Sequence, residues 1–336
     1  MTTSISNFSF ARNRKLITPI LVAVLMLVIV IVAYTRNPAV TQAVLASTIR
    51  QSTPLILGAL CGILCERAGI VNIGIEGQML LSAFTAYMTN VWTGNLLLSV
   101  IVGMLTGAVS GLLLAFTAIK LKLNQIIGGT VINILALGLT GFFYQTGMTT
   151  KGKLLPVAIP GLSKIPLIGP VLFDNPPITY LAIMLVIILQ VVLYATPWGL
   201  RTRAVGEHPR AADTVGINVF TTRYVNVIIG GSIAGLAGAF LTLEAVGSFE
   251  RNMTNGRGFV ALAVMIFGKW NPLGAWGAAL LFGFANAMQT QLQFMGTTIP
   301  HQFIGMIPYV LTIVVVSGFV GRSRAPAAEG TPYEKE

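Results

Sequence analysis

The chain alternates long apolar runs with short polar breaks, and most of its charged residues lie in the breaks. A run of about 18 or more apolar residues is long enough to cross the hydrocarbon core of a bilayer as a helix. Some runs are shorter, but glycine, proline or charged residues bound each of them, and we count them as crossings too. The pattern predicts ten spans, at residues 16–34, 51–65, 75–88, 96–119, 125–144, 178–195, 224–243, 259–267, 273–288 and 303–319.

Composition supports an all-α integral membrane protein. Of the 336 residues, 54% are hydrophobic and only 9% are charged, with a mean hydropathy of +0.81, more apolar surface than a soluble core can use. The 36 glycines suit helices that pack closely in lipid. Gly103, Gly107 and Gly111 recur at four-residue spacing in one run and predict a packing seam.

The net charge of +11 follows the ends of the runs rather than a nucleic-acid-binding surface. If the basic N-terminus is cytoplasmic, alternating crossings place 14 of the 21 Lys and Arg residues inside and 7 outside, as the positive-inside rule expects. Both termini are then cytoplasmic. The chain divides into an N-terminal segment (1–15), a transmembrane domain (16–320) with an outer loop at 146–177 and a cytoplasmic loop at 197–223, and a tail (321–336).

The polar stretch at 66–78 interrupts two apolar runs with three glycines and several charged or amide side chains. Broken helices are tolerated in membranes where their backbone lines a cavity or is buried in protein. On one interpretation, Asn72, Glu76 and Gln78 face a substrate pathway or hold the break shut. On the other, the polar groups cap two half-helices, and Glu66 and Arg67 lie at the inner surface.

Other polar or aromatic residues are weaker pathway candidates. Gln125 and Asn133 lie in the fifth run, and isolated amides in helix bundles often bind a neighbouring helix instead. Phe249 is suited either to stack on a planar ligand or to pack. Cys61 and Cys65 are expected to pack, and the two histidines are too isolated to indicate a metal site.

The longest basic stretch between two runs contains a short helix signature. Pro209 suits a first helical position and Gly216 a left-handed C-terminal position. With Ala211 and Ala212 exposed, a groove of another protein could approach closely. We interpret this stretch as a docking helix that uses Gly206, Glu207, Pro209, Arg210, Ala211, Ala212 and Gly216.

Two further patterns bear on mechanism. Residues 123–128 (LNQIIG) resemble residues 300–305 (PHQFIG) at the start of the tenth run, which supports two five-helix halves of opposite orientation. Residues 147–154 (GMTTKGKL) approach a phosphate-binding loop, but they end in Leu154 and lack the strand–helix context. We find no catalytic constellation, and we expect the chain not to be an enzyme and to hold no metal or cofactor.

Residues 69–79 (GIVNIGIEGQM), 124–133 (NQIIGGTVIN) and 203–217 (RAVGEHPRAADTVGI) resemble the permease subunits of bacterial ABC importers in the branched-chain amino acid/ribose superfamily. They are most similar to the nucleoside, or simple-sugar, branch, which commonly has Asn where this chain has His208. The likeness covers residues from about 50 to 320.

The resemblance implies a complex of two permeases, identical or related, with two ATP-binding subunits and an extracytoplasmic binding protein or lipoprotein, in a bacterial or archaeal plasma membrane. It implies import of nucleosides, with a simple sugar as the alternative, and makes the docking helix the coupling helix that meets the ATPase. A second hypothesis is a carrier driven by an ion gradient, in which Glu66, Glu76 and Glu244 relay protons.

Overall fold

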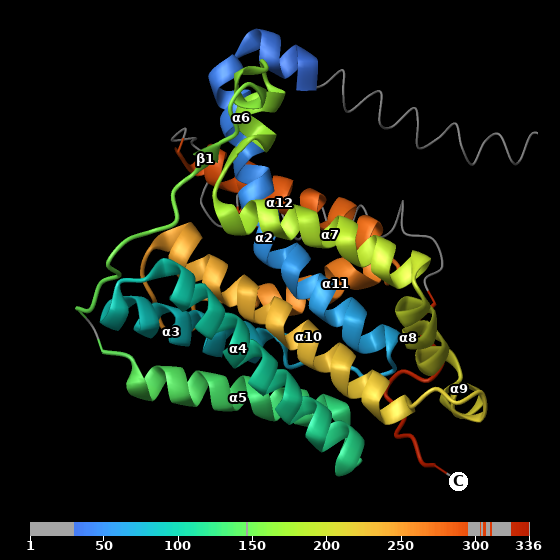
Figure 1. The fold of residues 1–336 in the computed structure, drawn as a ribbon. Coiled ribbons are helices and arrows are strands. Elements are labelled where there is room, and N and C mark those ends of the chain that lie inside the picture. Colours follow the sequence, from blue (N-terminus) through green and yellow to red (C-terminus); the bar gives the residue numbers. More distant parts are fainter. Residues whose placement is uncertain are drawn as a thin grey trace, which may run out of the picture.

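The computed structural model describes residues 30–145, 147–294, 303, 305–306, 310 and 324–335. This part of the chain is mostly helical (Figure 1). Its helices are α2 (Pro38–Arg67), α3 (Ile75–Thr93), α4 (Leu96–Ala115), α5 (Gln125–Phe143), α6 (Ile168–Leu172), α7 (Pro177–Ala195), α8 (Pro197–Glu207), α9 (Pro209–Thr214), α10 (Val219–Ala239), α11 (Arg257–Phe267) and α12 (Pro272–Phe294). Smaller elements are the π-helical η1 (Phe116–Lys120) and η3 (Phe240–Val246), the 3₁₀ turn η2 (Leu162–Lys164), and strands β1 (Val157–Ala158) and β2 (Asp174–Asn175).

Five helices of the described chain are long and apolar enough to cross a membrane: α2, α4 with η1, α5, α7, and α10 with η3. The chain is therefore a multi-pass, all-helical membrane protein. Helices α3, α11 and α12 occupy three further predicted runs. The first and last predicted runs, at 16–34 and 303–319, lie mostly outside the described residues, as do residues 300–302 of the repeat. Ten crossings and the inverted repeat thus stay predictions.

Helix α2 differs from the short second run that the sequence predicts. It begins at Pro38, because the Asn37 side chain accepts the Val40 N–H and caps the helix while Pro38 fills a first-turn position. It runs for 30 residues with Pro54 in its interior. The polar residues at 41–53 hid this first half, since they break the apolar run without breaking the helix. This first half is only partly covered by other helices, whereas the residues from Ser52 to Glu66 are all buried.

The burial of its side chains shows that α2 is the central helix. In the most apolar 18-residue stretch of α2, 89% of the residues are buried, against 28% in the corresponding stretches of α4 and α5. It lies between α10 on one side and α7 with α12 on the other, while α3, α4 and α5 extend the α10 side (Figure 1). Side chains on the second half of α2 therefore face other helices almost all round, while its first half projects toward one end of the bundle (Figure 1).

The predicted glycine seam is confirmed between α4 and α10. A Cβ atom added at Gly107 would lie 2.2 Å from the Gly231 carbonyl oxygen and 2.7 Å from the Gly235 Cα atom. A Cβ atom at Gly111 would lie 2.8 Å from the Val227 carbonyl oxygen, and one at Gly103 would lie 3.3 Å from the Ala239 Cβ atom of the same helix. Because backbone faces backbone here, any side chain would force the two helices apart.

The connecting segments gather at the two ends of the bundle. At one end, the C-terminal residues lie beside α8 and α9 (Figure 1), and the Lys122 amine lies 2.6 Å from the Glu334 carboxylate. At the other end, the Lys151 N–H donates to Asn90 Oδ1 (2.8 Å). There the predicted outer loop, 146–177, is folded by the β1–β2 ribbon and α6. This grouping matches alternating crossings; which end is cytoplasmic stays a prediction.

Candidate functional site

The discontinuity predicted near residue 70 is confirmed. Helix α2 ends at Arg67, α3 begins at Ile75, and residues 68–74 between them are not helical. Gly69 has φ +87°, a left-handed conformation that suits glycine, and the Ile70 N–H bonds back to the Cys65 carbonyl, which closes the last turn of α2. We call residues 68–74 the break; its exposed backbone groups need partners from other helices.

Helix α5 supplies those partners along one face. Gln125 Oε1 accepts the Val71 N–H (2.7 Å), and Asn133, two turns further on, accepts the Gly77 N–H (2.7 Å) and donates to the Ile73 carbonyl (3.0 Å). Gly129 lies between them, and a Cβ atom there would be 2.7 Å from the Gly74 nitrogen. The spacing of four residues places all three on the same side of α5. The α5 face is thus shaped to hold the break.

A buried amide pair closes the break from the α2 side. The Asn72 amide donates to Gln78 Oε1 (3.1 Å) and approaches the Sγ atoms of Cys61 and Cys65 at 3.4 and 3.5 Å. Both amide side chains are fully buried, and both cysteines are free and buried. Since a buried amide is costly without hydrogen bonds, this cluster fixes the position of Asn72 between the two helices.

Glu76 connects the break to α11. Its carboxylate accepts the N–H groups of Gly256 (2.8 Å) and Gly258 (2.6 Å) at the first turn of that helix. A helix N-terminus carries unsatisfied N–H groups and partial positive charge, and a carboxylate satisfies both. Gly258 must be glycine-sized here, because a Cβ atom would lie 2.5 Å from the Glu76 backbone.

Five of the six pathway candidates therefore converge on the break: Asn72, Glu76, Gln78, Gln125 and Asn133. Phe249 lies in a separate cluster. It is 1% exposed, and its ring centroid is 5.2 to 5.8 Å from those of Phe84, Tyr87 and Tyr144. In this structure Phe249 packs against other aromatic side chains, which is the second of the two roles that the sequence left open. Glu66, too, is buried, and it accepts the Trp270 indole N–H (2.5 Å) rather than facing the inner surface.

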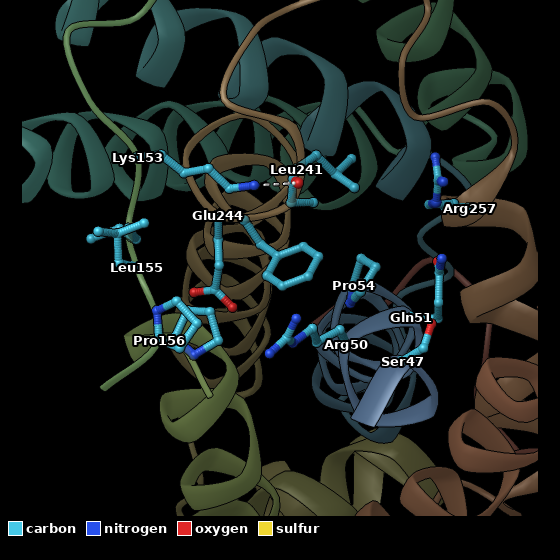
Figure 2. A pocket seen from close by; sticks show the side chains of 14 residues that line it. Ser47, Arg50, Gln51, Pro54, Lys153, Leu155, Pro156, Leu241, Glu244 and Arg257 are labelled. Atoms are coloured by element: carbon cyan, nitrogen blue, oxygen red, sulfur yellow. Dashed lines mark hydrogen bonds between the residues drawn. The ribbon is translucent and has the colours of Figure 1, made fainter. Parts of the chain in front are cut away.

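A cavity of about 310 Å³ opens beside the first half of α2, at the end opposite α9 (Figure 2). Its wall includes Arg50, Gln51 and Pro54 of α2, the loop at 153–156 and part of η3. Pro54 has no N–H, which leaves the Arg50 carbonyl without its usual helical donor. A π-helical segment such as η3 likewise disturbs the regular ladder.

Charged groups of opposite sign line this cavity. The Glu244 carboxylate accepts the Ile178 N–H (2.8 Å) and the Thr179 hydroxyl at the start of α7, and Arg50 lies close enough to attract it (Figure 2). Gln51 and Arg257 also border a second cavity, of about 340 Å³, whose wall includes Phe282, Asn286, Gln289 and Thr290. The paired cavities suit a small polar molecule with a flat apolar face.

The sequence did not single out Arg50, Gln51 or Arg257. Arg50 and Arg257 stand at the edges of predicted runs, where a cation is normally read as a helix boundary. The sequence nevertheless carried a signal for Arg50 and Arg257: in a chain with only 9% charged residues, a cation next to an apolar run is a candidate pathway residue. Only the length of α2 and the fold around α11 place them on one cavity.

The predicted docking helix is present as α9, shorter than the stretch 207–217. Pro209 begins it, and Gly216 has φ +84°, as predicted. Ala211 is exposed, but Ala212 is 3% exposed, so the prediction that both alanines are exposed is wrong. One residue turns a helical side chain by about 100°, enough to take Ala212 to the inner face. Gly206 and Glu207 are the last two residues of α8 rather than part of α9, and a Cβ atom at Gly206 would lie 2.2 Å from the Arg67 carbonyl oxygen.

Neither a metal site nor a phosphate loop appears in the described part of the chain. No group of three or more His, Cys, Asp and Glu residues there has the geometry for a metal ion. The glycine-rich stretch 147–154 is irregular and leads into no helix. That the chain holds no cofactor stays a prediction.

Comparison with known proteins matches residues 44–316 to the family described as "branched-chain amino acid transport system / permease component". The chain is 42% identical to the guanosine ABC transporter permease protein NupQ of Bacillus subtilis, over 87% of this chain and 96% of that protein. It is 40% identical to the nucleoside ABC transporter permease protein NupC of Lactococcus lactis, over 88% and 97%. It is 35% identical to a putative glucose ABC transporter permease protein, TsgC13, of Haloferax volcanii, over 87% and 97%.

The relatives include pairs of permeases from one organism. The B. subtilis NupQ is accompanied by a guanosine permease NupP, and the L. lactis NupC by a nucleoside permease NupB, which are 26% and 25% identical to this chain. No solved structure matches the chain. The family match and the near-complete coverage of these permeases agree with the multi-pass helical fold. The chain therefore belongs to the branched-chain amino acid transport system permease family and is a transport component, not an enzyme.

Proposed function

We propose that this chain is the membrane-spanning subunit of an ATP-driven importer for nucleosides. The single observation that carries the proposal is its similarity, over almost the whole length of both proteins, to permeases named for guanosine and for nucleosides. The alternative cargo is a simple sugar, which the similarity to a putative glucose permease favours.

The proposed assembly contains a second permease, two ATP-binding subunits and an extracytoplasmic binding protein. The pairs of permeases among the relatives support a related second permease rather than an identical copy. ATP is bound and hydrolysed by the partner subunits. The assembly lies in a bacterial or archaeal plasma membrane with both termini of this chain in the cytoplasm, on the end that holds α9.

In this assembly α9 is the coupling helix. Glu207, Pro209, Arg210 and Ala211 lie on or beside its outward side and would meet the ATPase, while Gly206, Ala212 and Gly216 fix its position on the bundle. ATP binding closes the ATPase pair, moves the coupling helices, and shifts the permeases between inward-open and outward-open states. No bond in the cargo is made or broken.

The cavity beside α2 is the proposed outer part of the passage. A nucleoside has a flat base and a hydroxylated sugar, and Gln51, Arg50 and Arg257 offer hydrogen-bonding groups beside apolar walls. The change Gln51→Leu should lower nucleoside uptake about 5-fold, since losing one hydrogen bond costs on the order of 1 kcal/mol. Thr130→Val, on an exposed face of α5, is the matched control and should have no effect.

The decisive test is uptake of labelled guanosine, uridine and adenosine by cells that express this chain with its partner subunits. ATP-dependent uptake that excess nucleoside suppresses, and that glucose and leucine do not, supports the proposal. ATP-dependent uptake of glucose alone would replace the cargo. Uptake by this chain alone that collapses with the proton gradient would favour the ion-driven carrier instead.

Docking on the ATPase has its own test. Ala211→Trp adds a bulky side chain to the exposed side of the coupling helix and should abolish co-purification with the ATPase while the permease still inserts in the membrane. Leu200→Trp, at a residue 62% exposed on α8, controls for added bulk. Undiminished ATPase binding by Ala211→Trp would show that α9 is not the docking element.

A further inference from the structure

The C-terminal residues 324–335 form a segment that crosses the end of the bundle beside α8 and α9 (Figure 1). We call residues 326–333 the strap. Two backbone hydrogen bonds fix its course: the Ala328 N–H donates to the Gly206 carbonyl (2.9 Å), and the Gly330 N–H donates to the Gly69 carbonyl (3.2 Å). Gly206 lies in the last turn of α8, the helix that leads into α9, and Gly69 belongs to the break. Within three residues, the strap therefore bonds both to the approach to the coupling helix and to the discontinuity in the pathway.

A buried cation holds the next part of the strap. Arg223 of α10 is 1% exposed, and its guanidinium donates to the Thr331 carbonyl (3.1 Å). A buried guanidinium is costly unless acceptors surround it, and this carbonyl is one that the strap provides. The same guanidinium borders Gly69, where an added Cβ atom would lie 2.9 Å from its Nη2 atom. Arg223 therefore touches both the strap and the break.

Tyr333 covers the inner face of the coupling helix. It is 6% exposed and packs in one cluster with Val205, Ala212 and Val219, and its ring lies 5.3 Å from that of Phe220. Ala212 is the alanine whose burial the sequence did not predict, and this cluster is the reason for its burial. The outward side of α9, with Pro209 and Ala211, borders a groove of about 600 Å³ whose other wall is the strap.

We propose that the strap is a mechanical link that passes movement of the coupling helix to the break between α2 and α3. Tyr333 holds the strap to α9, and Gly330 and Arg223 hold it to the break. When the ATPase displaces α9, the strap moves with it and draws on the backbone at Gly69, next to the residues that α5 and α11 hold in place. This inference rests on the proposed coupling to an ATPase, but it does not depend on which cargo is carried.

The experiment compares the assembled transporter with wild-type permease, with Tyr333→Ala, and with a chain that ends at Arg324. Hydrogen exchange of the amides at 69–74 is measured without nucleotide and after trapping with ATP and vanadate. A nucleotide-dependent change of at least 3-fold is expected in the wild type and is expected to disappear in both variants, while ATPase subunits still co-purify. Uptake per assembled complex should fall at least 10-fold with ATP hydrolysis retained. Lys335→Ala, at a side chain that is 65% exposed and makes only a 3.6 Å ion pair with Asp213, is the matched control and should behave as wild type.

Three outcomes would overturn the link. If the variants retain the nucleotide-dependent change at 69–74, the strap does not carry the movement. If they lose the ATPase subunits, the strap is a docking element instead. If the wild type shows no nucleotide-dependent change, the break does not respond to the ATPase. A wild type that shows the change and carries no nucleoside refutes the proposed cargo and leaves the strap intact.

Discussion

Replacing Asn133 by alanine should loosen the break and destabilise the permease. The Asn133 side chain is the hydrogen-bond partner of two backbone groups, the Gly77 N–H and the Ile73 carbonyl, at 2.7 and 3.0 Å. Alanine removes both bonds and leaves both groups buried between α3 and α5. The surrounding helix cannot replace the partners, because residue 73 is not helical.

The size of the effect separates two views of this residue. An average polar contact between membrane helices is worth about 0.6 kcal/mol, because the separated helices find other partners. Leaving a buried backbone group unsatisfied costs about 1–3 kcal/mol, so two such groups should cost roughly 2–4 kcal/mol after some access of water. Gln125→Ala removes one partner, the acceptor of the Val71 N–H, and should cost about half as much. Thr130→Ala, whose hydroxyl bonds only to its own helix at Ile126, should cost little.

The assay is thermal unfolding of the purified permease in detergent, followed by initial uptake rates of the assembled transporter. We expect Tm to fall in the order Asn133→Ala, then Gln125→Ala, then Thr130→Ala, with a fall on the order of 5 °C for the first. Uptake should follow the same order. An Asn133→Ala variant that melts within 1 °C of Thr130→Ala would refute the idea that α5 holds the break.

Three further predictions follow from single contacts. Gly107→Ala should destabilise by about 1–3 kcal/mol in thermal unfolding, because its Cβ atom meets α10 backbone at 2.2 Å, while Gly138→Ala, with open space around it, should be neutral or slightly stabilising. Glu76→Ala should cost about 3 kcal/mol by orphaning two N–H groups of α11, and Glu76→Gln much less; a stable Glu76→Gln variant without uptake would instead support a pathway role. Burial raises the pKa of Glu329 above its ordinary value, an effect that the contact with Glu66 only partly offsets. The protonated carboxyl is then the form favoured in the docked strap, so docking is strongest below the ordinary glutamate pKa and weakens as pH rises through the raised pKa. Hydrogen exchange of residues 326–333, corrected for intrinsic rates, should be faster at pH 8 than at pH 5, and Glu329→Gln should remove the difference.

The nearby Glu334 does not obscure that pH window. Its pKa is lowered by the hydrogen bond and attraction from Lys122, so it contributes to docking above the ordinary glutamate pKa and loses that contribution only as pH falls through its lowered pKa. Between pH 5 and pH 8 Glu334 stays ionised. A dependence of the opposite sign, with faster exchange at pH 5, would contradict the assignment to Glu329.

Local features of the sequence determined the parts of the fold that depend on local chemistry. Apolar runs mark helices because a chain in lipid must satisfy its own backbone hydrogen bonds, and the glycines at 103, 107 and 111 mark a seam because only glycine lets two backbones meet. The break at 68–74 was visible as clustered glycine and polar residues inside an apolar stretch. Pro209 marked the start of α9, and Gly216 the turn that follows its end, for the same kind of reason.

Only the tertiary structure decided which distant groups meet. The second half of α2 is buried on every side, from Ser52 to Glu66, because neighbouring helices surround it, whereas the polar first half is only partly covered. Glu76 meets residues 256–258, Arg223 meets Thr331, and Tyr333 covers Ala212, and no periodicity relates these positions. A sequence states the hydrogen-bonding and packing capacity of each side chain; its partner depends on how the helices cross and where the chain returns.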